Sequence, residues 1–129
     1  QMNMLSGTLP TELGLLTKLT YLAFDTNTLT GIVPTELCQL TFLLELRLYT
    51  NALRGTLPTY LANLTNLKYL YMLDNKLTGP IPTEMGQLIS LLELRLNTNA
   101  LTGTLPMHLA NLTNLEYLIV GDNKLTGTV

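Results

Sequence analysis

The stretch LTYLAFDTNTLTGIVPTELCQL, residues 19–40, decides the fold because its landmarks recur every 24 residues along the chain. Five columns of identical residues share this period. They are Pro10, Pro34, Pro58, Pro82 and Pro106; Gly7, Gly31, Gly55, Gly79, Gly103 and Gly127; Asn3, Asn27, Asn51, Asn75, Asn99 and Asn123; Leu22, Leu46, Leu70, Leu94 and Leu118; and Leu5, Leu29, Leu53, Leu77, Leu101 and Leu125. A fixed period of this length predicts a stack of similar coils, each of which buries its leucines against its neighbours.

Each landmark has a predicted structural role. Leu22 and Phe24 alternate with other residues, which predicts a short strand with one buried face. Asn27 is expected to turn its amide inward and bond backbone groups that the following turn would otherwise leave unpaired. Gly31 suits a positive φ or a close backbone approach. Pro34 suits the entry to a short helical or 3₁₀ turn on the opposite side of the coil.

The pattern from Leu19 to Pro34, with its Leu-x-Gly-x-Val-Pro ending, resembles the leucine-rich repeat of the plant-specific 24-residue class. That class occurs in receptor-kinase ectodomains, receptor-like proteins and polygalacturonase inhibitors. The resemblance covers essentially the whole chain. It implies an α/β-type, right-handed solenoid of about five 24-residue repeats, with a parallel concave sheet and short 3₁₀ or helical convex turns.

Both ends of the chain lie inside a repeat. Gln1 occupies the phase of Asp25, and Val129 occupies the phase of Val33. No capping segment is recognisable, and uncapped ends expose core leucines. We therefore expect residues 1–129 to be one uncapped solenoid segment, either internal to a longer protein or covered by a partner at its ends.

Composition argues against several classes of function. Only 12% of the residues are charged and the net charge is −2, so no basic patch for nucleic acid is expected. No apolar run is long enough for a membrane segment. Cys38 and His108 are the only residues of their types and lie in different repeats, which argues against a metal site or a catalytic pair. The sequence therefore predicts no enzyme activity, no metal and no cofactor.

A 48-residue period overlies the first, because Glu45–Leu53 recurs with few changes as Glu93–Leu101. In the family that the chain resembles, ligands meet the exposed positions of the concave strands. At those positions Tyr and Arg, which carry much binding energy in interfaces, gather with acidic and amide side chains. The predicted ligand-binding residues are Tyr21, Glu45, Arg47, Tyr49, Tyr69, Tyr71, Glu93, Arg95, Asn97 and Tyr117.

An alternative interpretation is that these side chains satisfy one another. In a parallel sheet Tyr71 would lie between Arg47 and Arg95, where cation–π stacking is possible. Each arginine is also two residues from a glutamate, Glu45 or Glu93, with which it can pair. The same surface would then be a structural ladder.

Two further motifs recur. Asn63-Leu64-Thr65 and Asn111-Leu112-Thr113 are N-glycosylation sequons on the predicted convex side, although the repeat consensus alone can produce this tripeptide. Threonine also recurs in columns, before glycine at Thr30, Thr78, Thr102 and Thr126 and after proline at Thr11, Thr35, Thr59 and Thr83. A regular threonine array could match ice, and the simpler interpretation is a neutral, β-favouring surface.

The function that the sequence favours is non-catalytic recognition, at the cell surface or outside the cell, of a protein, peptide or glycan ligand. The alternative is a structural repeat glycoprotein that assembles with copies of itself into a surface, wall or filament array.

Overall fold

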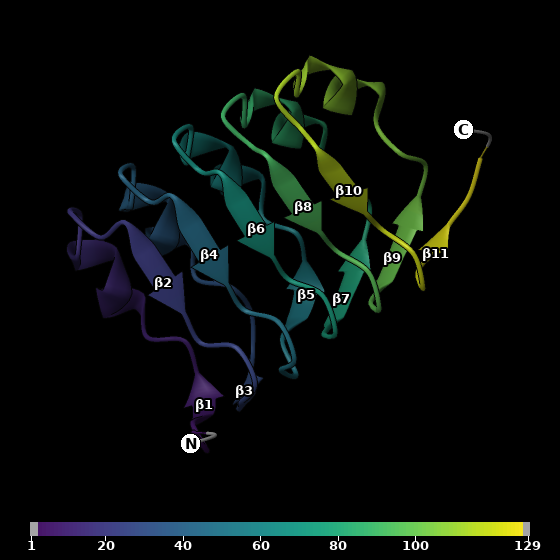
Figure 1. Cartoon of the computed structure of the whole chain (residues 1–129). Coiled ribbons are helices and arrows are strands. Elements are labelled where there is room, and N and C mark those ends of the chain that lie inside the picture. Colours follow the sequence, from purple (N-terminus) through teal and green to yellow (C-terminus); the bar gives the residue numbers. More distant parts are fainter. Residues whose placement is uncertain (1–2, 128–129) are drawn as a thin grey trace.

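The computed structural model describes residues 3–127, and they form a curved stack of coils (Figure 1). Each full coil contains a strand of a main sheet, a strand of a second sheet and a 3₁₀ turn. The main-sheet strands are β2 (Tyr21–Ala23), β4 (Glu45–Arg47), β6 (Tyr69–Tyr71), β8 (Glu93–Arg95) and β10 (Tyr117–Ile119). The second-sheet strands are β1 (Ser6–Thr8), β3 (Thr28–Thr30), β5 (Arg54–Thr56), β7 (Lys76–Gly79), β9 (Ala100–Gly103) and β11 (Lys124–Leu125). The 3₁₀ turns are η1 (Thr11–Leu15), η2 (Thr35–Gln39), η3 (Thr59–Asn63), η4 (Thr83–Gln87) and η5 (Met107–Asn111).

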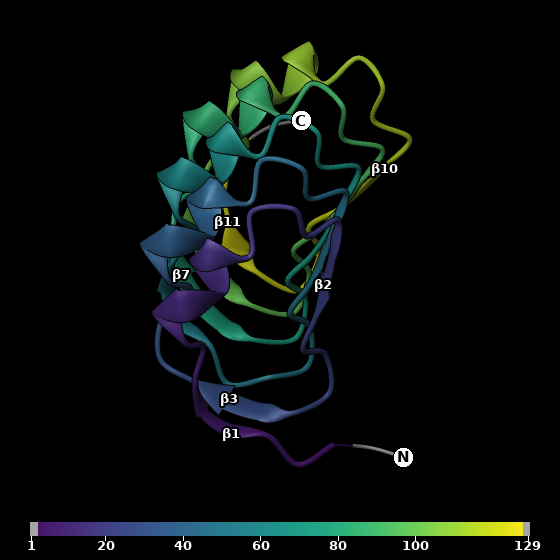
Figure 2. The same ribbon diagram turned by 90° about the vertical axis from the view of Figure 1, so that its left-hand side faces the viewer.

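The main sheet is parallel and its strands follow one another in the order β2, β4, β6, β8 and β10. The 24-residue period is also its register, so that Leu46 pairs with both Leu22 and Leu70. These leucines point inward, and the turns η1 to η5 gather on the side opposite this sheet (Figure 2). The predicted solenoid, with its parallel sheet and 3₁₀ turns, is confirmed.

The sequence did not reveal a second row of strands. It consists of the pair β1–β3 and the sheet β5–β7–β9–β11, all of whose pairings are parallel. The amides of Ala52 and Arg54 donate to the carbonyls of Leu29 and Gly31, both over 2.8 Å. These two hydrogen bonds join the pair β1–β3 to the sheet that begins with β5. These strands have only two to four residues, and β1, β5, β7 and β9 include a glycine, so they are too short to show the alternation of apolar residues that predicts a strand.

The leucine columns form one continuous core. Leu46, Leu70 and Leu94 of the main sheet are fully buried, and so are Leu37 and Leu40 on the side of the turns. Each 3₁₀ turn follows directly on a proline with extended backbone, such as Pro34 at φ −66°. The prediction that proline precedes the turns is therefore confirmed. None of the helices among residues 3–127 is long and apolar enough to cross a membrane.

The asparagine column forms a ladder of side chains that joins successive coils. The Oδ1 atom of Asn75 accepts a hydrogen bond from the Leu53 amide at 3.0 Å. Its Nδ2 atom donates to the carbonyls of Leu48 at 2.9 Å, Leu73 at 3.1 Å and Met72 at 3.3 Å. The predicted inward amide is therefore confirmed, and it binds both its own coil and the preceding one.

The residue before each asparagine of the column from Asn27 to Asn123 has a positive φ, which the sequence did not predict. Thr26, Thr50 and Thr98 have φ values of 56°, 53° and 56°, an uncommon conformation for a β-branched residue. Backbone bonds hold it in place, because the amides of Thr50 and Asn51 donate to carbonyls of the next coil at 3.1 and 3.2 Å. The predicted positive φ of glycine is confirmed, for example at Gly31 with φ +81°.

Tyr60 links two coils on the side of the turns. Because its pKa is raised, we expect the protein to lose stability at alkaline pH. Its hydroxyl donates to the Val33 carbonyl, and burial, followed by the nearby Glu36 carboxylate, raises the pKa of Tyr60 to about 12. The unfolded chain releases this proton at a lower pH, so the free energy of unfolding should fall as pH rises from about 10 to about 12. Urea denaturation across this range measures the effect. The Tyr60→Phe variant should show a shallower fall, and an equal slope in both proteins would contradict the prediction.

Candidate functional site

The outward face of the main sheet carries the candidate binding residues. Leu70 at the centre of β6 points into the core, so Tyr69 and Tyr71 on either side of it point outward. The same alternation places Glu45 and Arg47 outward on β4. All ten predicted residues lie on this sheet or on the loops directly after its strands.

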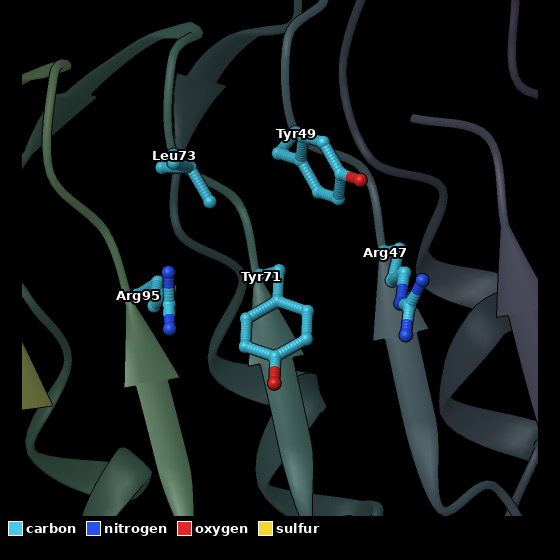
Figure 3. Close-up of a pocket in the computed structure, with 5 residues that line it drawn as sticks. All are labelled: Arg47, Tyr49, Tyr71, Leu73 and Arg95. Carbon is cyan, nitrogen blue, oxygen red and sulfur yellow. The ribbon is translucent and has the colours of Figure 1, made fainter. Parts of the chain in front are cut away.

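Four of the predicted residues meet around a shallow hollow of about 360 Å³ over β4, β6 and β8. Figure 3 shows the ring of Tyr71 at its centre, Arg47 on one side and Arg95 on the other, with Tyr49 and Leu73 on the loops beyond the strand ends. The hollow therefore has a cationic and aromatic part on the strands, and a more apolar part on the loops.

Cation–π contacts connect these side chains across the strands. The Cζ atom of Arg47 lies 5.9 Å from the ring centroid of Tyr71, and that of Arg95 lies 5.5 Å from the same centroid. Arg47 also lies 5.3 Å from the centroid of the Tyr21 ring. The predicted position of Tyr71 between two arginines is confirmed.

Two glutamates hold the arginines in place. The Nε atom of Arg47 donates to Glu45 Oε1, and that of Arg95 donates to Glu93 Oε1, each over 2.5 Å. Two positive and two negative charges therefore alternate on this surface. The local net charge is close to zero, so the hollow lacks the excess positive charge that a polyanion requires.

Glu93 and Tyr71 share a hydrogen bond, in which the Tyr71 hydroxyl donates to Glu93 Oε2 over 2.7 Å. Glu93 is only 8% exposed, and burial by itself raises the pKa of a carboxylate. Hydrogen bonds from Tyr71 and Arg95 outweigh burial and hold the pKa of Glu93 below its ordinary value. Burial, and then the bond to Glu93, raises the pKa of Tyr71, so the proton stays on the tyrosine.

The remaining predicted residues surround the hollow. Tyr69 packs beside Tyr71 with ring centroids 6.2 Å apart, while Tyr21 and Tyr117 are 46% and 57% exposed. Asn97 follows β8, and its Oδ1 atom is inaccessible without a hydrogen-bond partner among residues 3–127. A buried acceptor without a partner is uncommon in proteins.

Leu73 lines the hollow but is missing from the predicted set. It occupies the same repeat phase as Tyr49 and Asn97, so its position was recognisable from the period. Its residue type gave no such signal, because a leucine in this repeat is usually part of the core. Leu73 is half-buried here.

The contacts of the alternative interpretation are also present, because both Glu–Arg pairs and both stacks on Tyr71 form. They do not use all of the hydrogen-bonding capacity of the surface. A guanidinium has five N–H donors, and the Nε bond of Arg47 to Glu45 occupies one of them. The ladder therefore orients the arginines and leaves donors free for another molecule.

The two sequons lie far from the hollow. Asn63 and Asn111 are the last residues of η3 and η5, and both are exposed. Cys38 lies half-buried in η2, and no three side chains of metal-binding type gather within the described part of the chain.

Comparisons with known proteins relate the chain to repeat proteins of plants. The family model described as Leucine Rich Repeat matches residues 66–88. Among solved structures, the ectodomain of the Arabidopsis thaliana receptor kinase GASSHO1/SCHENGEN3, in complex with CASPARIAN STRIP INTEGRITY FACTOR 2, is 40% identical with a TM-score of 0.97; the match covers 98% of this chain. The Arabidopsis receptor kinase HAESA, in complex with the peptide hormone IDA and a co-receptor, is 36% identical over 95% of this chain with a TM-score of 0.93.

A plant ice-binding protein is 35% identical over 95% of this chain, with a TM-score of 0.89. The chain spans 15% of the first receptor structure, 21% of the second and 40% of the ice-binding protein. A comparison with curated proteins found no match.

Proposed function

We propose that this chain, a leucine-rich-repeat solenoid that resembles plant receptor ectodomains, is a non-catalytic recognition module that binds a protein or peptide on its main sheet. The observation that carries the proposal is the hollow around Tyr71, which combines oriented guanidinium donors with aromatic and apolar walls. Tyrosine and arginine of this kind are the side chains most enriched among the residues that dominate binding energy in interfaces.

The charge pattern favours a peptide over a polyanion. Because Glu45 and Glu93 neutralise the two arginines, the hollow offers directional N–H donors without a strong positive field. Peptide carbonyls are acceptors for such donors, and apolar peptide side chains can contact Tyr49 and Leu73. Two of the similar structures are described as complexes with a peptide hormone or an integrity factor, which supports this class of ligand.

We place the module outside the cell, because the similar structures are described as ectodomains or receptors. Asn63 and Asn111 are the proposed N-glycan sites, and both are accessible on the side of the turns, away from the hollow. Neither the fold nor the comparisons support the alternative of self-assembly.

The test uses a peptide library displayed on phage, selected on the intact chain, with the dissociation constant of each selected peptide measured by surface plasmon resonance. Replacing Tyr71 and Arg95 together by alanine should weaken these peptides by roughly 30-fold, which corresponds to a hot spot of about 2 kcal/mol. The reason is that the double variant removes the Tyr71 ring and the Arg95 guanidinium, with its N–H donors, from the lining of the hollow.

The matched control replaces Thr35 and Thr83, which are exposed on the side of the turns, by alanine. It should leave the affinity unchanged, and circular dichroism should show the same fold for all proteins. Equal affinity of the Tyr71/Arg95 double variant and the control would show that the hollow is not the binding site.

A second candidate function, ice binding, is favoured by the threonines on the second sheet. Thr30, Thr78 and Thr102 precede their glycines at the same phase, and all are exposed. The similar plant structure described as an ice-binding protein supports this candidate. Thermal hysteresis of the purified chain tests it: a gap between melting and freezing temperatures is expected, and an absence of both a gap and adsorption to ice would reject it.

A further inference from the structure

The second sheet presents a regular threonine surface, here called the threonine face. It consists of three cross-strand pairs that follow the parallel register: Thr8 with Thr30, Thr56 with Thr78, and Thr104 with Thr126. All six side chains are exposed. Partners lie on adjacent strands about 4.8 Å apart, and the pairs repeat every second coil.

In each pair, the hydroxyl of the threonine that precedes a glycine is held by a backbone group. The Oγ1 atoms of Thr30, Thr78 and Thr126 donate to glycine carbonyls of the preceding coil at 3.2, 3.4 and 3.4 Å. Threonine is also stiff at χ1, so each hydroxyl has few alternative positions. The surface therefore loses little side-chain entropy when it contacts another ordered surface.

In each pair, the methyl group of the threonine that follows a glycine packs on a glycine of the next coil. The Cγ2 atoms of Thr8, Thr56 and Thr104 lie 2.8 to 3.0 Å from the points where Gly31, Gly79 and Gly127 would carry a Cβ atom. Glycine at these positions thus leaves the space that the methyl groups occupy. The methyl groups are fixed in a row because the backbone of the neighbouring coil supports them.

Arg54 interrupts this surface, and Lys76 and Lys124 on the same sheet are exposed cations as well. It occupies the position of Thr30 and Thr78 in its own coil, and in the register it lies directly opposite Lys76. Like charges in that arrangement disfavour each other. None of the residues that flank the glycines of the second sheet within residues 3–127 is acidic. The two cations therefore have no counter-charge among those residues.

We infer that the threonine face is the surface that contacts ice and that Arg54 limits its activity, an inference that rests on the second candidate function above. Ice presents a rigid and periodic array of water molecules, so its binding surface must be rigid and periodic as well. Fixed hydroxyls can take the place of water in hydrogen bonds, and fixed methyl groups can sit between them. A guanidinium holds its own hydration shell, which does not match that array. The main sheet, with its alternating Arg and Glu, is unsuited for the same reason.

The test compares three single variants of the whole chain. Thr78→Arg adds a charge to the central pair, and Arg54 shows that the same position of the repeat tolerates arginine. Arg54→Thr removes the guanidinium beside the central pair and leaves Lys76 unchanged. Thr59→Arg, at the exposed first residue of η3, is the matched control on the side of the turns. The measurements are thermal hysteresis and the adsorption of fluorescently labelled protein to a single ice crystal.

We expect Thr78→Arg to lose thermal hysteresis, Arg54→Thr to exceed the unchanged protein, and Thr59→Arg to equal it. Activity that survives Thr78→Arg and is lost in the Tyr71/Arg95 double variant would overturn the threonine face while leaving ice binding intact. Equal activity of Arg54→Thr and the unchanged protein would overturn the role of Arg54. Absence of hysteresis and adsorption in every protein, including Arg54→Thr, would reject the second candidate function itself.

Discussion

Replacing Asn75 by alanine should lower the free energy of unfolding by about 2 to 4 kcal/mol, because the Leu53 amide loses its partner at about 1 to 3 kcal/mol and three carbonyls each lose one of two donors. The carbonyls are those of Leu48, Met72 and Leu73, which keep donors from Asn51, Asn99 and the Thr50 amide. Domains of this size are stable by roughly 5 to 15 kcal/mol, so the loss is a substantial share of the total. Urea denaturation followed by circular dichroism measures the loss.

Two further variants show which bonds matter. Asn75→Asp keeps an acceptor for the Leu53 amide but places a charged oxygen without a proton against three carbonyl oxygens, so at neutral pH it should be no more stable than Asn75→Ala. Asn63→Ala, at an exposed position of η3, should change stability by no more than about 0.5 kcal/mol. If Asn75→Ala is as stable as Asn63→Ala, the asparagine ladder does not hold the coils together.

Replacing Gly86 by alanine should destabilise the chain by about 1 to 3 kcal/mol, because the added methyl group overpacks the contact between η4 and η5. A Cβ atom at Gly86 would lie 2.4 Å from the backbone oxygen of His108 and 3.0 Å from its Cβ atom. A backbone oxygen cannot move aside alone, so one turn must shift against the other. The midpoint of urea denaturation should fall accordingly.

The matched control uses the same position of the preceding coil, where Ala62 is 5% exposed. Ala62→Gly should cost only about 1 kcal/mol, through the greater backbone freedom of glycine and a lost methyl contact. An unchanged midpoint for Gly86→Ala would show that the spacing between η4 and η5 is wider than the structure has it.

The comparison of Gly86 and Ala62 shows where sequence reasoning ends. Both residues occupy one column of the 24-residue period, in which Cys38 and Ala110 also occur, so the sequence suggests that alanine fits anywhere in it. The distance between successive coils decides whether it does. That distance depends on how all side chains between the two turns pack, and no local pattern records it.

On the binding surface, too, the sequence predicts some features and the tertiary structure decides others. The alternation around Leu70 was sufficient to predict that Tyr69 and Tyr71 point outward, and the period was sufficient to place Arg47 and Arg95 beside Tyr71. The hydrogen bond from Tyr71 to Glu93 and the contribution of Leu73 to the hollow depend on side-chain conformations, which the spacing of residues does not contain.

What the sequence by itself determined is the repeating coil: the main sheet, the inward leucines, the asparagine ladder and the prolines that precede the turns. The reason is that every coil repeats the same local environment, so a residue that recurs at one phase has one role. Only the tertiary structure decided that a second row of strands exists, because its strands pair through the backbone and are too short to show an alternating pattern. The tertiary structure also decided which side chains of different coils meet, since those contacts depend on the packing between coils.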